Sequence, residues 1–262
     1  MMKDYVKNNQ KAWDEAYQHA PKTYKDIVKK LKDNPTHYLS DFLMLHLDET
    51  DVKNKDIAQF ACNNGREILA LGLNYGAKAI AGYDLSPTMI QDASLSAEAF
   101  KLPSHFQVMD LNDYTDTRTF DTLFIMIGVL CWFDDLNTLF DACANALKPG
   151  GKLYLIDGHP FTNVYAIDGE EGFNPDHPYL PVHAYFRKAP FIEHSAMGYV
   201  SDVIPKSPFT SYIHTFEHIF EALLKKFTLT TFKESNDNLL GLFPELDQKD
   251  LPLVFMIKAQ KS

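Results

Sequence analysis

The sequence predicts an α/β fold built on a doubly wound, mostly parallel sheet of seven strands with helices on both faces. From residue 56 onward, short apolar segments alternate with longer amphipathic ones. Strands that alternate with helices in this way form parallel sheets. The segment 123–127 (LFIMI) is apolar at every position, which indicates a strand buried on both faces of the sheet.

The predicted elements follow one another with few interruptions. Pro87 stands at the first position of one predicted helix, where its missing N–H costs nothing, and the KPGG segment (148–151) predicts a sharp turn before the next strand. The expected strands are 56–61, 79–84, 105–110, 120–128, 152–157, 191–200, 228–234 and 251–261, and the expected helices are 66–74, 86–100, 134–147 and 211–227.

Two regions fall outside this alternation. Residues 1–50 are expected to form a helical lid whose helices break near Pro21 and end at Pro35. Residues 51–262 form the core, interrupted by an insert at 158–210 that holds seven of the fourteen prolines. Such a long irregular segment in a compact domain is usually functional or carries its own strands.

Composition narrows the classes of function. The net charge of −10 and the lack of a basic block disfavour nucleic acid as a partner. Three cysteines without a CxxC pair indicate a reducing compartment. No apolar run approaches the ~18 residues that a membrane span needs, and the polar N-terminus lacks a signal core. We therefore expect a soluble, cytoplasmic protein without a membrane partner, either a monomer or a homodimer.

The first strand–turn–helix unit carries the main functional signal. The turn Ala61–Gly65 contains small and polar residues, so its backbone can approach a ligand that also faces the helix N-terminus. Asp84 follows Gly65 by nineteen residues, the position at which nucleotide-binding units place an acid on the ribose hydroxyls. Alternatively, Asp84 only shapes the turn that follows its strand.

Three further segments complete a recognisable order: VMDLNDY (108–114) after strand three, GVLCWF (128–133) after strand four, and LKPGG (147–151) before strand five. Over residues 52–160, the chain resembles the class I S-adenosylmethionine-dependent methyltransferases, which have a Rossmann-like fold. WDEAYQHA (13–20), GVLCWF and DGHPF (157–161) are similar to an uncharacterised bacterial subfamily that acts on small molecules.

The resemblance implies S-adenosylmethionine as cofactor and S-adenosylhomocysteine as product. It implies that the loop 61–65 contacts the methionine end, Asp84 the ribose and Asp110 the adenine amino group. It also implies residues on a lid helix that closes over the cofactor, residues that flank the adenine and residues that lie beneath the sulfonium. The full set is Trp13, Tyr17, Ala61, Cys62, Asn63, Gly65, Asp84, Leu85, Met89, Asp110, Leu111, Ile127 and Gly128.

The loop departs from the family pattern, which is Gly-x-Gly-x-Gly after an acid. Gln59 replaces the acid, Ala61 replaces the first glycine and Asn63 replaces the second. The change at Gln59 removes a charge that often steers the cofactor's ammonium group. These departures predict an altered affinity for the cofactor.

Methyl transfer needs alignment of the acceptor, and it needs a base only when the acceptor must lose a proton early. His159 follows strand five and is a candidate base or substrate contact, or else a residue that braces the turn. His214 and Glu217 are candidates for a polar pair on one helix face, and no metal site is expected although His214 and His218 are four residues apart. Candidate substrate contacts are Trp132, Tyr165 and His183.

The sequence thus predicts methyl transfer to a small molecule. Two alternatives stay open: a protein that binds S-adenosylmethionine without catalysis, favoured by the altered loop, and an NAD-dependent oxidoreductase, which would also use Asp84 but lacks a GxGxxG loop. The aromatic-rich insert indicates a partly apolar acceptor in an enclosed pocket.

Overall fold

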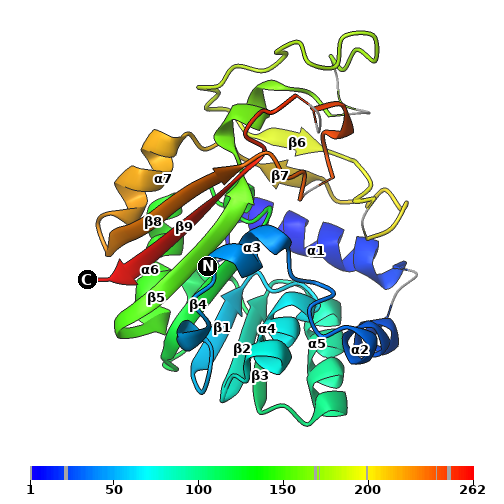
Figure 1. The fold of residues 1–262 in the computed structure, drawn as a ribbon. Helices are drawn as coiled ribbons and strands as arrows, with labels where there is room; N and C mark the ends of the chain where they lie inside the picture. The colour runs from blue at the N-terminus through cyan, green and yellow to red at the C-terminus, as the bar shows by residue number, and fades with distance from the viewer. Residues whose placement is uncertain are drawn as a thin grey trace.

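The computed structural model describes residues 2–20, 23–167, 170, 172–198, 200–239, 241–246 and 249–262. Within them, seven strands form the main sheet in the order β3-β2-β1-β4-β5-β9-β8 (Figure 1). The strands are β1 (Asp56–Phe60), β2 (Ala79–Asp84), β3 (Ser104–Val108), β4 (Phe120–Met126), β5 (Leu147–Gly158), β8 (Phe227–Ser235) and β9 (Val254–Lys261).

The sheet is parallel from β3 through β5, and β9 runs antiparallel to both of its neighbours. This confirms the predicted doubly wound α/β fold. The helices are α1 (Asp4–Gln18), α2 (Tyr24–Asp33), α3 (Asp41–His46), α4 (Arg66–Tyr75), α5 (Pro87–Phe100), α6 (Leu136–Ala146) and α7 (Phe216–Leu223), with short 3-10 turns at Glu49–Asp51, Leu111–Asp113, Leu130–Trp132, Pro160–Val164 and Pro244–Leu246.

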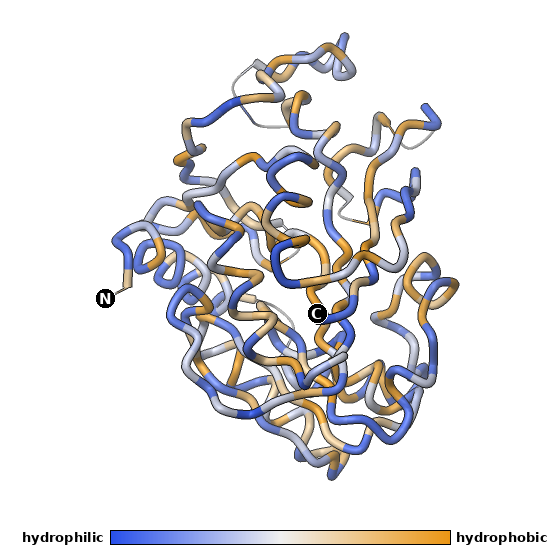
Figure 2. Tube along the Cα trace, turned by 90° about the vertical axis from the view of Figure 1, so that its left-hand side faces the viewer, coloured by the Kyte–Doolittle hydropathy of each residue, from blue (hydrophilic) through white to orange (hydrophobic). Residues whose placement is uncertain are grey.

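Side chains of the central strands alternate between two cores. Ala58 and Phe60 pack with α6 and α7 on one face, whereas Ile57 packs with α2, α3 and α4 on the other. Period-2 alternation in strands covered on both sides explains why residues 123–126 of β4 are all apolar. Figure 2 shows how hydrophobic and hydrophilic residues alternate along the chain.

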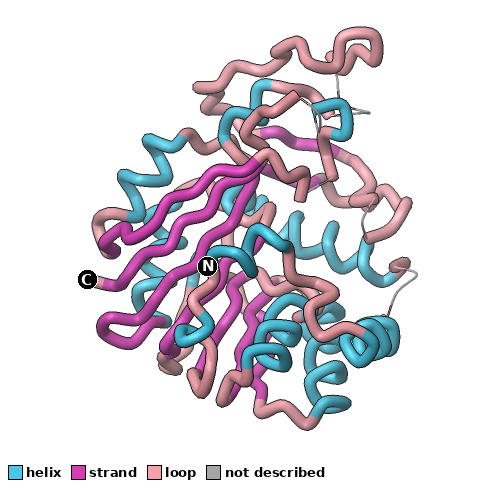
Figure 3. The backbone as a smooth tube through the Cα atoms, viewed as in Figure 1, coloured by secondary structure: helices cyan, strands magenta, loops and turns pink. Residues whose placement is uncertain are grey.

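Four sequence predictions need correction. The expected strand 191–200 is limited to β6 (Phe191–Glu193), which pairs with β7 (Phe209–Ser211), because β7 offers only three partner residues. The expected helix 211–227 begins at Phe216, where the Thr215 hydroxyl caps it by accepting from the His218 amide. The remainder of the insert is mostly loop (Figure 3). Residues 148–151 bulge within β5 instead of preceding it, since Leu147 pairs with Phe120 and Lys152 with Thr122.

The third expected strand, 105–110, ends at Val108, so Asp110 lies in the turn that follows it. The predicted break between the N-terminal helices falls between Gln18 and Tyr24, and Pro21 itself lies outside the described residues. No helix within the described ranges is long and apolar enough to cross a membrane.

The turn after β4 is held by one carboxylate. Asp157, near the end of β5, accepts hydrogen bonds from the amides of Gly128 (2.8 Å), Val129 (3.0 Å) and Leu130 (2.8 Å), and from that of Gly158 (2.7 Å). Burial raises the pKa of Asp157, and the four amide donors oppose that rise. The carboxylate therefore joins the exits of two neighbouring strands.

The Asp157→Asn variant should lower the free energy of unfolding by about 3 kcal/mol, because an amide cannot accept all four bonds and leaves buried N–H groups unpaired. Urea denaturation measures this loss. The matched control is Asp33→Asn at an exposed helix end, which should change stability by less than about 0.5 kcal/mol. Equal effects of the two substitutions would contradict the assignment.

Candidate functional site: the carboxyl edge of the parallel strands

The predicted cofactor residues gather at the carboxyl ends of β1, β2, β3 and β4, and α1 crosses this edge of the sheet (Figure 1). The loop 61–65 leaves β1, Asp84 ends β2, Asp110 follows β3, and Ile127 and Gly128 follow β4. In open α/β sheets ligands bind at this edge. The structure thus brings together residues that are as many as 67 positions apart in the sequence.

The loop keeps the backbone path of a glycine-rich turn. Ala61, Asn63 and Gly65 all have positive φ angles, of 49°, 52° and 73°. Asn adopts this left-handed region more readily than other non-glycine residues, while Ala pays a steric cost. Cys62 between them is fully buried against the core, so its thiol is not presented to a ligand. The loop therefore has positive φ angles at the three positions where the family pattern has glycine.

Asp84 fastens this loop. Its carboxylate accepts from the Asn63 amide at 2.7 Å and from the Ser86 amide at 3.0 Å. Burial raises the pKa of Asp84, and the amide donors oppose the rise. A carboxylate offers about four lone-pair positions, so the backbone amides leave room for a hydroxyl donor. Turn formation and ligand binding, posed as alternatives by the sequence, are compatible at this residue.

Asp110 has one engaged and one unengaged oxygen. Its Oδ1 accepts from the backbone and side-chain amides of Asn112 at 3.0 and 2.9 Å, whereas its Oδ2 is buried and has no partner among the described residues. Leaving a buried acceptor unpaired costs about 1–3 kcal/mol. An amino group supplied by a ligand would satisfy this oxygen.

Two more buried oxygens near the loop lack partners in the described part of the chain: Oε1 of Gln59 and Oδ1 of Asn64. The Asn64 amide nitrogen donates to the Tyr17 hydroxyl at 3.2 Å, which fixes the orientation of its side chain. Asn64 also lines a cavity of about 410 Å³ together with Lys30 and Arg66. Hydrogen-bond acceptors and cationic side chains thus line the same cavity. A zwitterionic ligand group needs both, acceptors for its ammonium and cations for its carboxylate.

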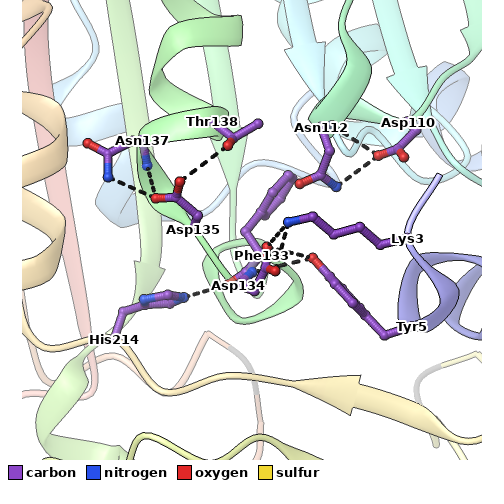
Figure 4. Close-up of polar contacts among 10 residues, drawn as sticks. All are labelled: Lys3, Tyr5, Asp110, Asn112, Phe133, Asp134, Asp135, Asn137, Thr138 and His214. Carbon is purple, nitrogen blue, oxygen red and sulfur yellow. Dashed lines mark hydrogen bonds and ion pairs between the residues drawn. The ribbon is translucent and has the colours of Figure 1, made fainter. Parts of the chain in front are cut away.

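The first helix of the predicted lid, α1, is fastened across this edge. Tyr17 donates to Asp92 on α5 at 2.8 Å, and Gln10 donates to the Leu85 carbonyl at 2.8 Å. Near the other end, Lys3 and Tyr5 bind Asp134 (Figure 4). Further contacts join Asp14 to Ser86 and Thr88, Asn9 to Thr210, and Ser201 to the Ala16 carbonyl. Met89 is buried under this helix with Ala16 and Tyr17.

Aromatic rings close the side of the site nearest the insert. Trp13 contacts Trp132 and Phe209 edge-on, with ring centroids 5.4 and 5.1 Å apart. Trp132 lies in the 3-10 turn after β4, and Phe209 begins β7. Rings from α1, the core and the end of the insert therefore form one apolar wall.

His214 lies against the same turn. Its Nε2 is 2.8 Å from the Phe133 carbonyl oxygen (Figure 4), and the Tyr212 amide donates to the Cys131 carbonyl. Since a carbonyl only accepts, Nε2 carries the proton, and the lone pair of the neutral ring is on Nδ1. Burial lowers the pKa of His214, so the neutral ring predominates at pH 7.

The predicted pair of His214 and Glu217 does not form in the described structure. His214 precedes the cap residue Thr215 and so lies outside the helix, although its ring contacts that of His218 edge-on with centroids 6.2 Å apart, and Glu217 is exposed on α7. The helix starts after His214 because the Thr215 cap intervenes. No group of three or more potential metal ligands occurs among the described residues.

His159 is engaged at both ring nitrogens. Nε2 is 2.8 Å from Glu234 Oε1, and Nδ1 accepts from the Phe161 amide at 3.0 Å. Burial lowers its pKa, and Glu234 partly opposes this. With both nitrogens occupied, His159 braces the turn after β5.

The two other insert candidates lie apart from the aromatic wall. Tyr165 is buried in a separate cluster with Phe243, and His183 packs on Phe191, with Nε2 3.6 Å from Glu170. The sequence interpretation missed Asp157, although an acid at the end of a buried strand was a usable signal. It gave no signal that Asn64 would meet Tyr17.

The Ala61→Gly variant should raise the free energy of unfolding by about 0.5–1 kcal/mol, because glycine adopts a positive φ without a steric penalty. Chemical denaturation measures the change. Ala99→Gly, at an exposed position inside α5, is the control and should lose about 1 kcal/mol. A loss at both positions would show that Ala61 is not strained.

Comparison with known proteins agrees with this geometry. The sequence model of a methyltransferase domain family matches residues 58–155. A ubiquinone biosynthesis O-methyltransferase of Coxiella burnetii is 27% identical over 144 residues, which cover 53% of this chain. The match spans only 60% of the length of that relative.

Solved structures share the fold. An S-adenosylmethionine-dependent methyltransferase from Mesorhizobium loti has a TM-score of 0.63 at 22% identity, covering 88% of this chain and 99% of that one. Geranyl diphosphate C-methyltransferase from Streptomyces coelicolor A3(2), solved with S-adenosyl-L-homocysteine, has a TM-score of 0.62 at 15% identity over 99% and 98% of the two chains. Residues 58–155 thus match a methyltransferase domain family, and the likeness to these solved structures is one of fold.

Proposed function

We propose that this protein transfers the methyl group of S-adenosylmethionine to a hydroxyl group of a small, partly apolar molecule. The observation that carries the proposal is the strand edge where a turn with three positive φ angles meets the carboxylates of Asp84 and Asp110. The O-methyltransferase relative supports a hydroxyl acceptor.

The residues present suit the cofactor. Asp84 would accept from the ribose hydroxyls, and the unpaired oxygen of Asp110 would accept from the adenine amino group. The unpaired oxygens of Asn64 and Gln59 would receive the ammonium group in place of the family's acid. Ile127 and Gly128, with φ angles of 28° and 80°, would lie beneath the sulfonium end.

Bound S-adenosylmethionine supplies the activated methyl carbon, and this chain's residues supply alignment and exclude water. The wall of Trp13, Trp132 and Phe209 would hold an apolar acceptor. His214 would take the proton of its hydroxyl at Nδ1, because the Phe133 carbonyl holds the proton on Nε2. His159 is left out as a base because both of its nitrogens are engaged.

We further propose that residues 1–50 act as a lid over the cofactor and that the insert at 158–210 covers the acceptor. The bonds of α1 to Asp92, Leu85 and Asp134 support the first role, and the packing of Phe209, at the end of that region, on Trp13 supports the second. The partner is a small molecule.

Wild-type protein should bind S-adenosylhomocysteine with micromolar affinity by calorimetry, and Asp84→Asn should weaken binding about 100-fold, since an amide loses acceptors that ribose hydroxyls use. Asp176→Asn, at an exposed insert position, is the control and should bind as wild type does. Wild-type protein that binds no cofactor at millimolar concentration would refute the proposed function.

The pH profile tests His214. Its lowered pKa means that the neutral base is present at and above pH 7, so kcat/KM should be flat there and should fall at lower pH as the ring protonates. His214→Gln should reduce the rate at pH 7 by about 10²-fold, whereas His218→Gln, at the exposed neighbour, should not. The acceptor for this assay would come from a screen of phenols and catechols. A His214→Gln rate equal to wild type would exclude this base.

A further inference from the structure

The chain contains the same turn twice, once before the 3-10 turn Leu111–Asp113 and once before α6 (Figure 4). In each turn, an aspartate oxygen accepts hydrogen bonds from the asparagine two residues later. In the first, Asp110 Oδ1 accepts from the backbone and side-chain amides of Asn112 at 3.0 and 2.9 Å. In the second, Asp135 Oδ1 accepts from the same two groups of Asn137 at 2.9 and 2.8 Å. The geometry of one turn therefore serves as a reference for the other.

The outer oxygens of the two turns differ. In the turn before α6, Asp135 Oδ2 accepts from the Thr138 hydroxyl at 3.4 Å, and Asn137 Oδ1 accepts from Lys225 at 2.7 Å. In the turn after β3, Asp110 Oδ2 and Asn112 Oδ1 are both buried and unpaired within the described residues. In the exposed turn, protein groups donate hydrogen bonds to the outer oxygens. In the buried turn, no described residue does so.

Helix capping explains only one of the two turns. Asp135 caps an eleven-residue helix, whereas Asp110 precedes a turn of three residues. A buried acceptor without a partner costs about 1–3 kcal/mol, so two of them at a short turn call for an external donor. The two unpaired oxygens lie on opposite sides of the shared hydrogen bond (Figure 4), and they do not compete for one donor.

We propose that Asn112 is a positioning residue that makes this site selective for a purine with an amino group at C6. By binding Asp110 Oδ1 twice, Asn112 fixes the carboxylate so that Oδ2, which only accepts, is left for that amino group. Hypoxanthine carries a carbonyl oxygen at C6, and this oxygen would face the carboxylate as a second acceptor. The inference rests on the proposed function, because it assumes that an adenosyl ligand binds at Asp110.

The test measures selectivity by calorimetry with S-adenosylhomocysteine and S-inosylhomocysteine. Wild-type protein should prefer the adenosyl ligand by at least ~100-fold, since sites built for a particular hydrogen bond reject ligands that lack it. Asn112→Ala should weaken adenosyl binding about 10-fold and inosyl binding less, so that the preference falls. Asn112→Asp keeps the size but loses the donor, and it should lose at least as much preference.

Asn137→Ala is the matched control, because it removes the same contact from the other turn. It should leave the preference unchanged while lowering the urea midpoint, and urea curves for the Asn112 variants show that they are folded. If both Asn112 variants kept the wild-type preference for the adenosyl ligand, the positioning role of Asn112 would be overturned, but the proposed function would not. Wild-type protein that binds neither ligand would overturn the proposed function and this inference with it.

Discussion

The acceptor side of the site depends on one carboxylate, that of Asp157. Its four amide bonds shape the turn after β4, and that turn leads directly to Trp132 and Phe133. The segment after β4 also positions His214, because the Phe133 carbonyl binds the His214 ring. Without Asp157, the aromatic wall and the His214 ring would lose their common support.

A second constraint is the fastening of α1. Its side chains bind groups on α5, after β2 and after β4, so the helix links three of the segments that would surround a cofactor. Tyr17 bonds both Asp92 and Asn64, and it thereby joins the lid to the glycine-type loop.

The loop 61–65 shows how a motif can lose its signature residues and keep its geometry. Ala61 and Asn63 adopt the conformation that glycine adopts without strain, and Asn63 compensates by holding the next amide with its own side chain at 2.7 Å. Gln59 stands where the family has an acid. Its Oε1 and the Oδ1 of Asn64 are two neutral oxygens that are buried and have no partner among the described residues. The loop thus combines positive φ angles with a polar side chain, that of Asn63, at a position where the family pattern has glycine.

The sequence by itself determined the alternation of strands and helices along the chain, the two-sided burial of β4 and the position of Asp84 at the end of its strand, because periodicity and turn chemistry are local properties. It misplaced the start of α7 and extended β6, since a cap residue and the length of a partner strand decide those boundaries. Only the tertiary structure decided that His159 is braced by Glu234, that Glu217 faces solvent and that Asp110 keeps one unpaired oxygen while Asp135 does not. Hydrogen bonds between residues distant in sequence settle such questions, and no local pattern encodes them.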